Sequence, residues 1–421
     1  MRLPKAKTAI LVGLLGVYLA ALALVLDNVA ERGVLRTVLM LAVPTLLCGL
    51  GAYYVLRLRF RELLFVLIPV AILAALLEAG FSAYLAVHPE RAPALLWGHG
   101  DDLGRYFAYR PHHYTLFTLK EGYRNDQGTV HNRQGFRDAE DLPQIKPPGE
   151  FRIFFIGGSS TYTVGVKDNR RIFTHRLEEA LNREAASRDV KRTFRVVNAG
   201  LGAATSAENL GRLIFLIHPY EPDLVVIQHG LNDVLPRLRG SIRSDYANYR
   251  RNWCGGTGRE YDFFLKRWVY DHVLRNSRLL TFLSVRLKLV EPNTIRGAIT
   301  NDAFEERVEN LERNATDYFR RNTELMVLTA RHAGGDVILA SCPFNDLVGE
   351  ARMRAMPEHN TVLEDVARRM DVPFFDLHRL FPRDPEHLPD GLHVSREGSD
   401  RKAQLYFDYL VETYGLFRGR P

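Results

Sequence analysis

The sequence FRIFFIGGSST, residues 151–161, carries the clearest fold signal in the chain. Six residues rich in Ile and Phe lead into Gly157, Gly158 and then Ser159. An apolar run closed by two glycines is typical of a buried strand that turns sharply at its carboxyl end. In an open α/β sheet, ligands bind at that end of the strands. The stretch therefore predicts that Ser159 faces a crevice, although taken alone it also fits a turn that only links a strand to a helix.

From residue 151 onward, short apolar runs alternate with stretches of helical periodicity. We expect strands at 151–156, 193–198, 223–228, 336–341 and 373–377. We expect helices at 170–184, 206–217, 305–332, 359–370 and 397–413. This alternation predicts a parallel sheet with helices on both faces. Residues 235–300 interrupt it with a basic, aromatic insertion, which we expect to form a lid or a binding wall.

The charge of the chain does not indicate a nucleic-acid-binding protein. The 421 residues carry a net charge of +7, but residues 1–62 hold eight basic and three acidic groups, which leaves only +2 for the rest. Charged residues make up 25% of the chain and hydrophobic residues 46%, as in ordinary globular proteins. The length suggests two or three folded units, and the basic excess fits a membrane topology signal.

Three apolar stretches near the start of the chain, 9–26, 37–56 and 63–87, are each about long enough to cross a bilayer. A signal peptide is the alternative for the first stretch, but the two that follow argue against it. Basic residues before the first stretch and at 57–62 predict that both segments are cytoplasmic. We therefore expect an integral membrane protein whose residues after 87 lie outside the cytoplasm.

Residues 88–150 form a connector rich in Pro, Gly, His and Tyr. Its His112, His113 and His131 could be metal ligands, but acidic and cysteine partners do not recur at ligand spacing, which favours polar surface positions. We therefore divide the chain into a membrane domain at 1–87, a connector at 88–150, and a domain at 151–421 that contains the insertion 235–300.

The three cysteines, Cys48, Cys254 and Cys342, lie far apart and form no C-x-x-C motif. They therefore predict no cysteine metal site. A Cys254–Cys342 disulfide stays open for a chain outside the cytoplasm.

Three further segments follow predicted strands or precede the last predicted helix: NAGLGAATS at 198–206, GLND at 230–233 and DGLH at 390–393. Each alone is explained by a turn or a helix cap. Together with Ser159 they supply what acyl transfer needs.

Ser159 is a weak nucleophile unless a base stands beside it. His393 can take the serine proton and later give it to the leaving alcohol. Asp390, three residues earlier, can hold the imidazole tautomer and stabilise the imidazolium. The developing oxyanion needs donors fixed in advance. The candidates are the backbone N–H of Ser159, that of Gly202 or Ala203, and the side-chain amide of Asn232.

These four blocks resemble the motifs of the SGNH (GDSL-like) hydrolase superfamily, in order, over roughly residues 150–415. The resemblance implies a three-layer α/β/α, flavodoxin-like fold. It gives Ser159 the nucleophile role, Asn232 the oxyanion role, Asp390 the orienting role and His393 the base role. The layout of apolar stretches, connector and hydrolase domain looks like that of bacterial envelope members.

The sequence departs from the superfamily pattern at two positions. Gly158 stands where the usual G-D-S motif has its acid. Ungapped alignment puts Ala203 where the superfamily has its oxyanion glycine, with Gly202 just before it. Which of these two residues gives the N–H stays open. Other motifs that use a serine or a glycine-rich loop are absent from this stretch, since neither G-x-S-x-G, Walker A nor G-x-G-x-x-G fits it.

The sequence therefore predicts a membrane-anchored serine esterase that needs no metal and no organic cofactor. Its expected substrate is an O-acyl, for example O-acetyl, ester of an envelope glycan or lipid. Two alternatives stay open: an O-acyltransferase that uses the same triad on a glycan acceptor, and a catalytically vestigial glycan-binding or assembly protein.

Overall fold

The computed structural model describes residues 5–26, 34–88, 91, 95–96, 108–112, 114–250, 276–287 and 307–417. The chain divides into two compact units. The first comprises Met1–Leu103 and Asp262–Thr294, and the second Gly104–Tyr261 and Ile295–Pro421. The expected insertion at 235–300 is therefore shared between them.

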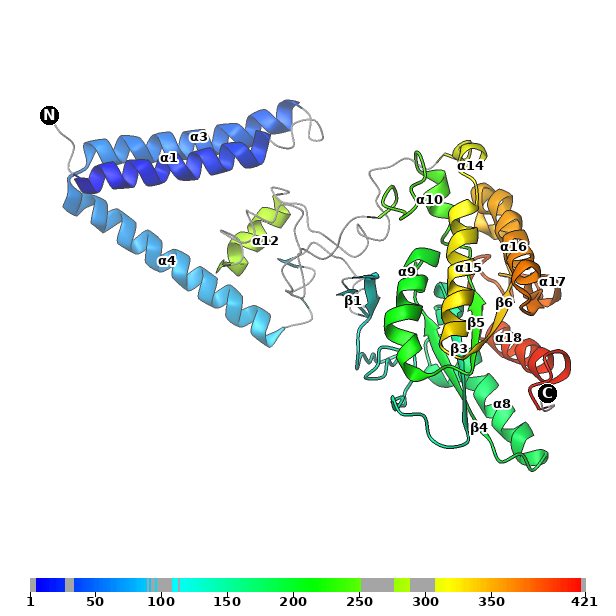
Figure 1. The fold of residues 1–421 in the computed structure, drawn as a ribbon. Helices are drawn as coiled ribbons and strands as arrows, with labels where there is room; N and C mark the ends of the chain where they lie inside the picture. The colour runs from blue at the N-terminus through cyan, green and yellow to red at the C-terminus, as the bar shows by residue number, and fades with distance from the viewer. Residues whose placement is uncertain are drawn as a thin grey trace. The chain divides into compact units, whose positions relative to one another are not determined.

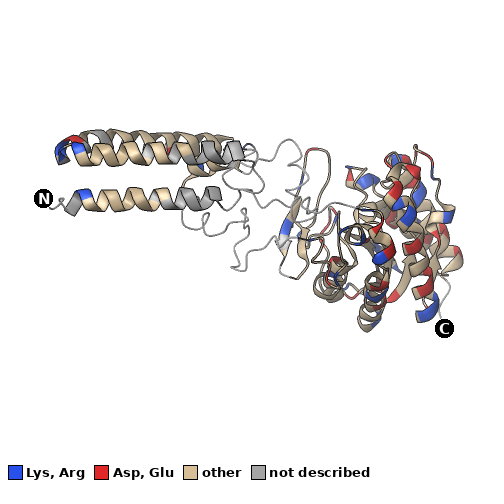
Figure 2. Ribbon diagram, turned by 90° about the horizontal axis from the view of Figure 1, so that it is seen from above, with Lys and Arg blue, Asp and Glu red and all other residues tan. Residues whose placement is uncertain are grey.

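The first unit contains three apolar helices: α1 (Lys5–Leu26), α3 (Val34–Arg57) and α4 (Phe60–Val87). Helices α1 and α3 pack side by side (Figure 1). The Nζ of Lys7 donates to the carbonyl of Leu58 at 2.7 Å, so the start of α1 lies beside the turn between α3 and α4. Figure 2 shows the described parts of these helices mostly free of charge, with Lys and Arg near one end.

One helical segment among the described residues, Leu67–Val87, is long and apolar enough to cross a membrane. Within α1, the described residues include a shorter apolar segment, Lys7–Gly16. The structure therefore supports one candidate span in place of the three expected from the sequence. A short helix from the insertion, α12 (Arg278–Arg286), packs against α4 (Figure 1).

The second unit is built on a five-stranded parallel sheet, as the strand–helix alternation predicted. Its strands are β3 (Glu150–Gly157), β4 (Thr193–Gly200), β5 (Leu224–Gln228), β6 (Asp336–Ala340) and β7 (Phe374–Phe375). Their order is β4-β3-β5-β6-β7, and every neighbouring pair is parallel. This is the flavodoxin-like order, in which the chain changes direction between β3 and β5 and leaves a crevice at their carboxyl ends.

Helices cover both faces of the sheet and make a three-layer sandwich (Figure 1). One layer contains α8 (Phe173–Ser187) and α18 (Arg396–Asp408), and the other contains α9 (Ser206–Arg212), α15 (Asp317–His332) and α16 (Glu350–Met370). Because side chains alternate along a strand, Ile153 and Phe155 of β3 enter the first layer, whereas Phe154 and Ile156 enter the second.

Shorter elements complete the second unit. They are β1 (Tyr109–His112), β2 (Leu116–Leu119), α7 (Ser159–Tyr162), α10 (Val234–Leu238), α14 (Asn310–Arg313) and α17 (Leu377–Leu380), with π-helical turns at Leu213–Ile217 and Tyr409–Thr413 and 3-10 turns at Asn169–Arg171, His218–Tyr220 and Asp346–Val348.

Two predicted helices differ from the structure. The helix expected at 305–332 is broken at Asn314, because the side-chain amide of Asn314 donates to the carbonyls of Arg237 and Gly240, both at 2.7 Å. The helix expected at 359–370 begins earlier, at Glu350, and keeps Pro357 inside it. A proline removes one helical hydrogen bond, but burial of the flanking helix turns outweighs that loss.

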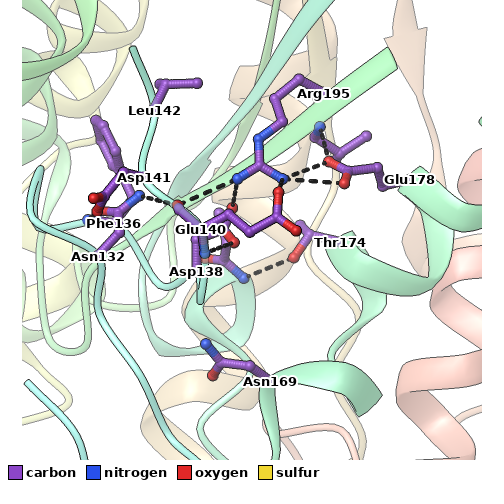
Figure 3. Close-up of polar contacts among 12 residues, drawn as sticks. Asn132, Phe136, Asp138, Glu140, Asp141, Leu142, Asn169, Thr174, Glu178 and Arg195 are labelled. Carbon is purple, nitrogen blue, oxygen red and sulfur yellow. Dashed lines mark hydrogen bonds and ion pairs between the residues drawn. The ribbon is translucent and has the colours of Figure 1, made fainter. Parts of the chain in front are cut away.

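The last part of the connector is fastened to β4, the strand at one edge of the sheet. The backbone N–H of Arg137 donates to the carbonyl of Asn198 at 3.1 Å. Arg195 on β4 makes ion pairs with Asp138 at 2.7 Å and with Glu178 on α8 at 3.1 Å (Figure 3). The connector therefore packs as part of the hydrolase-like unit.

Candidate active site

Ser159 lies where β3 ends and α7 begins. It is half-buried, and two glycines precede it. A Cβ on Gly157 would collide with the carbonyl of Gln228, and a Cβ on Gly158 would lie 2.7 Å from Nδ2 of Asn232. Glycine at 157 is thus required by the close approach of β5, whereas a side chain at 158 would displace the amide of Asn232.

His393 brings its ring to the serine from the loop before α18. Its Nε2 lies 2.7 Å from Oγ of Ser159, and its Nδ1 lies 2.6 Å from Oδ2 of Asp390. The other carboxylate oxygen of Asp390 accepts the backbone N–H of His393 at 2.8 Å and that of Leu392 at 3.0 Å. The carboxylate therefore fixes both the ring and the loop that carries it.

Direct contacts hold this histidine loop against the serine turn. Oγ of Ser160 donates to the carbonyl of Leu392 at 2.9 Å. The backbone N–H of Asn345 donates to the carbonyl of Gly391 at 3.1 Å. Gly391 has φ +85°, and a Cβ there would lie 2.7 Å from Val348, so a side chain is excluded on two grounds.

Asn232 follows β5 and lies over the same crevice. Its Nδ2 donates to the carbonyl of Ala204 at 2.8 Å. Gly202 and Ala203 form the middle of a turn closed by the N–H of Ala204, which donates to the carbonyl of Leu201 at 3.1 Å. That bond uses the N–H of Ala204, so Gly202 and Ala203 remain the two candidate backbone donors.

The conformation of Ala203 is one in which the glycine of the superfamily pattern would be favoured over alanine. Its φ is +63°, in the left-handed region that favours glycine. The turn is held from the insertion side by Arg250, whose Nη2 donates to the carbonyl of Ala203 at 2.7 Å and whose Nε pairs with Glu208 at 2.8 Å. Arg250 and Glu208 are both buried, so the first part of the insertion supports this turn.

A buried carboxylate fixes the loop that carries Asn232. Asp233 accepts the hydroxyl of Ser206 at 2.5 Å, the backbone N–H of Ser206 at 3.0 Å and the hydroxyl of Tyr246 at 3.0 Å. Burial acts to raise the pKa of Asp233, but the neighbouring His229 and the bond from Ser206 outweigh it and lower the pKa. An ionised carboxylate therefore ties the GLND loop to the start of α9.

Two charged groups beside the serine turn have shifted pKa values. Partial burial acts to raise the pKa of Asp390, but the bonds from the ring and the backbone of His393 outweigh it and lower the pKa. Lys402 on α18 is fully buried, and its Nζ donates to the carbonyl of Ser160 at 3.1 Å. Burial lowers the pKa of Lys402 to about 7.

The sequence analysis missed the support that the connector gives to the serine turn. The buried guanidinium of Arg137 donates to four backbone carbonyls of the loop after α7 and to one side chain, namely those of Tyr162, Thr163, Val166, Lys167 and Asn169. His131, expected at the surface, is instead buried, and its Nε2 lies 2.8 Å from the hydroxyl of Tyr162. Both residues belong to the connector sequence HNRQGFRD, residues 131–138.

One group in the described part of the chain could offer three metal-ligand atoms. Asp384, Glu386 and His387 have ligand atoms within 4.8 Å of one another, and the two acids are exposed. The Nδ1 of His387 already lies 2.8 Å from Asp384. His113 and Cys254 lie outside the described residues, so the Cys254–Cys342 disulfide stays open.

Comparison with known proteins supports the same chemistry. Residues 155–401, more than half of the chain, match the GDSL-like Lipase/Acylhydrolase family. Comparison with curated proteins gives no match.

Similar solved structures include an acetylxylan esterase from Geobacillus stearothermophilus, in a catalytic mutant, with 15% identity, a TM-score of 0.35, and coverage of 63% of this chain and 94% of that one. A lipase/acylhydrolase from Enterococcus faecalis is 19% identical, with a TM-score of 0.35 and coverage of 62% and 95%. The family match, over more than half of the chain, shows that the chain belongs to the GDSL-like lipase/acylhydrolase family of SGNH-type esterases.

Proposed function

We propose that this esterase works through Ser159 as nucleophile, His393 as general base and Asp390 as the group that orients the histidine. One observation carries the proposal: two consecutive hydrogen bonds, of 2.7 Å from Ser159 to His393 and 2.6 Å from His393 to Asp390. Nucleophile, base and orienting group within hydrogen-bond reach of one another are the geometric signature of an activated serine.

The proposed reaction has two steps. Oγ of Ser159 attacks the ester carbonyl carbon while Nε2 of His393 takes its proton. The ester C–O bond then breaks, and His393 gives the proton to the leaving alcohol. Water, activated by the same histidine, attacks the acyl-serine and releases a carboxylic acid. Protein groups perform each step, so we expect that no metal and no organic cofactor is needed.

We infer that the oxyanion is held by the backbone N–H of Ser159, that of Gly202 or Ala203, and the side-chain amide of Asn232. An amide has two N–H donors, and one N–H of Asn232 binds the carbonyl of Ala204. The second is available to the oxyanion. Loss of one such donor typically costs about 2.7–4 kcal/mol of transition-state stabilisation.

We propose that the substrate is an O-acyl, for example O-acetyl, ester of an envelope glycan or lipid, and that the enzyme is anchored in a membrane. The candidate span Leu67–Val87 supports the anchor. Lys7 lies beside the basic turn between α3 and α4, so positive charge gathers at one end of the helices. By the positive-inside rule that end is cytoplasmic, and we place the hydrolase unit outside the cytoplasm.

The test uses the purified full-length protein and a short p-nitrophenyl ester. Ser159→Ala should abolish hydrolysis and labelling by a fluorophosphonate, whereas Ser187→Ala, at the exposed end of α8, should leave both unchanged. Hydrolysis by Ser159→Ala at the wild-type rate would overturn the proposal. Wild-type protein that reacts with neither reagent would point to a vestigial site. Acyl transfer to an added glycan, in place of free acid, would identify an acyltransferase.

A further inference from the structure

The carboxylate of Glu78 lies near the middle of the candidate span Leu67–Val87. Ionisable side chains inside a span are costly unless they are paired, and they mark a site where a partner is held. Glu78 is the only acid or base in that segment. Its partner therefore indicates what packs against α4 within the membrane.

That partner is the start of α12. The hydroxyl of Ser277 donates to Glu78 at 2.6 Å, and the backbone N–H groups of Arg278 and Leu279 donate at 2.9 and 3.0 Å. These are first-turn N–H groups that the helix itself leaves without an acceptor, and a carboxylate there is also favoured by the helix dipole. Glu78 thus caps α12 and is itself satisfied.

A second contact sets the direction of α12 along α4. The rings of Phe81 and Phe282 lie 5.2 Å apart, one helical turn beyond the Glu78 cap on each helix. Both helices therefore run the same way, from the middle of the span toward Val87. Arg286, the last residue of α12, lies about 12 Å beyond its first residue, and a long basic side chain there can reach the headgroups.

The outer side of α12 carries exposed leucines together with two exposed arginines, Arg278 and Arg286, and Nη1 of Arg278 donates to the carbonyl of Ser82 on α4 at 3.5 Å. Leu280, Leu283 and Leu287 are 46%, 41% and 55% exposed, and on α4 Leu73 and Leu76 are 57% and 64% exposed. Leucines are therefore exposed on both helices near a carboxylate that is itself satisfied. Leucine side chains are compatible with the hydrocarbon of a bilayer, because they need no hydrogen bonds and lipid tails supply none.

We propose that α12 is a membrane-embedded helix that is held against α4 by Glu78 and whose exposed leucines contact lipid acyl chains. This inference rests on the membrane anchor in the proposed function and goes beyond it. The insertion would return the chain to the bilayer within the sequence of the hydrolase unit. The unit would then be tethered both before and after the first three strands of its parallel sheet, β3, β4 and β5.

The experiment uses full-length protein in vesicles of phosphatidylethanolamine and phosphatidylglycerol. A photoreactive benzoylphenylalanine replaces Leu76 on α4, Leu283 on α12 or, as an aqueous control, Leu380 on α17, which is 48% exposed. After irradiation, mass spectrometry detects lipid adducts. We expect adducts at 76 and 283, with at least a tenfold lower yield at 380.

Each other result overturns a defined claim. Adducts at 76 without adducts at 283, or crosslinks from 283 to protein, would refute the embedded helix and leave the anchor intact. Absence of adducts at 76 would refute the anchor and this inference with it. Hydrolysis of the p-nitrophenyl ester is measured on the same samples and tests the proposed catalysis separately.

The role of Glu78 is tested by two matched variants. Glu78→Ala should lower the yield of lipid adducts at 283 at least fivefold while the yield at 76 is kept. Glu62→Ala removes an acid from the first turn of the same helix, where it caps α4 itself, and should leave both yields unchanged. Equal yields at 283 in the two variants would refute the Glu78 tether.

Discussion

The loop before α18 contains the same pattern twice, as DPEH and as DGLH. In both, an aspartate accepts the backbone N–H of a histidine three residues later, at 3.1 Å for Asp384 and 2.8 Å for Asp390. In both, the ring Nδ1 lies close to that carboxylate, at 2.8 Å for His387 and 2.6 Å for His393. Only the second ring meets a serine, since Oγ of Ser159 lies 2.7 Å from it.

The comparison separates what local sequence builds from what the fold must supply. Four residues suffice to make an Asp–His pair, so the pair alone does not indicate catalysis. The second pair differs because the carbonyl of Leu392 accepts the hydroxyl of Ser160, which ties it to the turn after β3. In the first pair, the ring of His387 instead packs against the ring of Phe381, and the two ring centroids lie 6.2 Å apart. Catalysis therefore depends on β3, a strand distant in the sequence, which places Ser159 beside the second histidine.

Exchange of each histidine for alanine should show the largest difference between the pairs. We expect His393→Ala to lower kcat for a p-nitrophenyl ester by about 10⁴-fold, because the serine loses its base. His387→Ala should change kcat by less than about twofold. Steady-state kinetics of both variants test this, and a comparable loss in both would show that the first pair takes part in catalysis.

Exchange of each aspartate for asparagine should also lower kcat more at the second pair than at the first, but by a smaller factor than the histidine exchanges. Asp390→Asn should lower kcat by about 10²- to 10³-fold, since the amide no longer favours the reactive tautomer; the loss is smaller than for a buried aspartate because the Asp390 side chain is 56% exposed. Asp384→Asn should leave kcat unchanged. A wild-type rate for Asp390→Asn would remove the orienting role.

Lys402 contacts the serine turn, which only the second Asp–His pair meets. Its folded pKa of about 7 is below the usual 10.5, so between these values the unfolded chain binds more protons and stability rises with pH. From pH 7 to pH 9 this group should add about 2 kcal/mol to the free energy of unfolding. Urea denaturation at both pH values checks this.

The control for this pH effect is Lys402→Met, which removes the titrating group and keeps the length of the side chain. The difference in the free energy of unfolding between pH 7 and pH 9 should shrink by that amount in the variant. An unchanged difference would show that Lys402 is not the group responsible.

The smallest expected effect concerns the link that distinguishes the two pairs. Ser160→Ala removes the bond from the serine turn to the carbonyl of Leu392. We expect a loss of about 1 kcal/mol in the free energy of unfolding and a drop in kcat of a few fold, with KM unchanged. Denaturation and kinetics on the same preparation measure both, and a full wild-type kcat would show that the histidine loop holds its position without this bond.

Much of the fold was predictable because a strand can be recognised from the residues that form it. Strands β3 and β5 begin and end within one residue of the prediction, whereas β4 continues to Gly200, through the start of the NAGLGAATS motif. Strand–helix alternation predicted the parallel sheet, and the family resemblance implied its flavodoxin-like order. The meeting of Ser159 with His393 could be expected on topology, since carboxyl ends of parallel strands share one edge. The distances between their atoms could not be obtained in this way.

Other features were hidden because they depend on contacts between distant residues. Arg137 gives no local sign that its guanidinium will bind carbonyls 25 to 30 residues later. Ala203 has an ordinary side chain, and only its neighbours, including Arg250, hold it at φ +63°. His131 illustrates the same limit, since a polar residue in a Pro- and Gly-rich segment suggests exposure, yet the hydroxyl of Tyr162 makes burial favourable.

The two edges of the sheet decide whether a strand of another chain could pair with it. An unpaired strand edge invites another chain to add to it. At one edge, β7 offers only two residues, Phe374 and Phe375, too few for a stable ladder. At the other edge, the backbone of Arg137 already occupies the carbonyl of Asn198 on β4. Side chains of α8 occupy further groups on this edge, since Asn182 accepts the N–H of Phe194 and Glu178 accepts that of Val196. The connector and α8 together therefore leave few groups of β4 for an added strand to pair with.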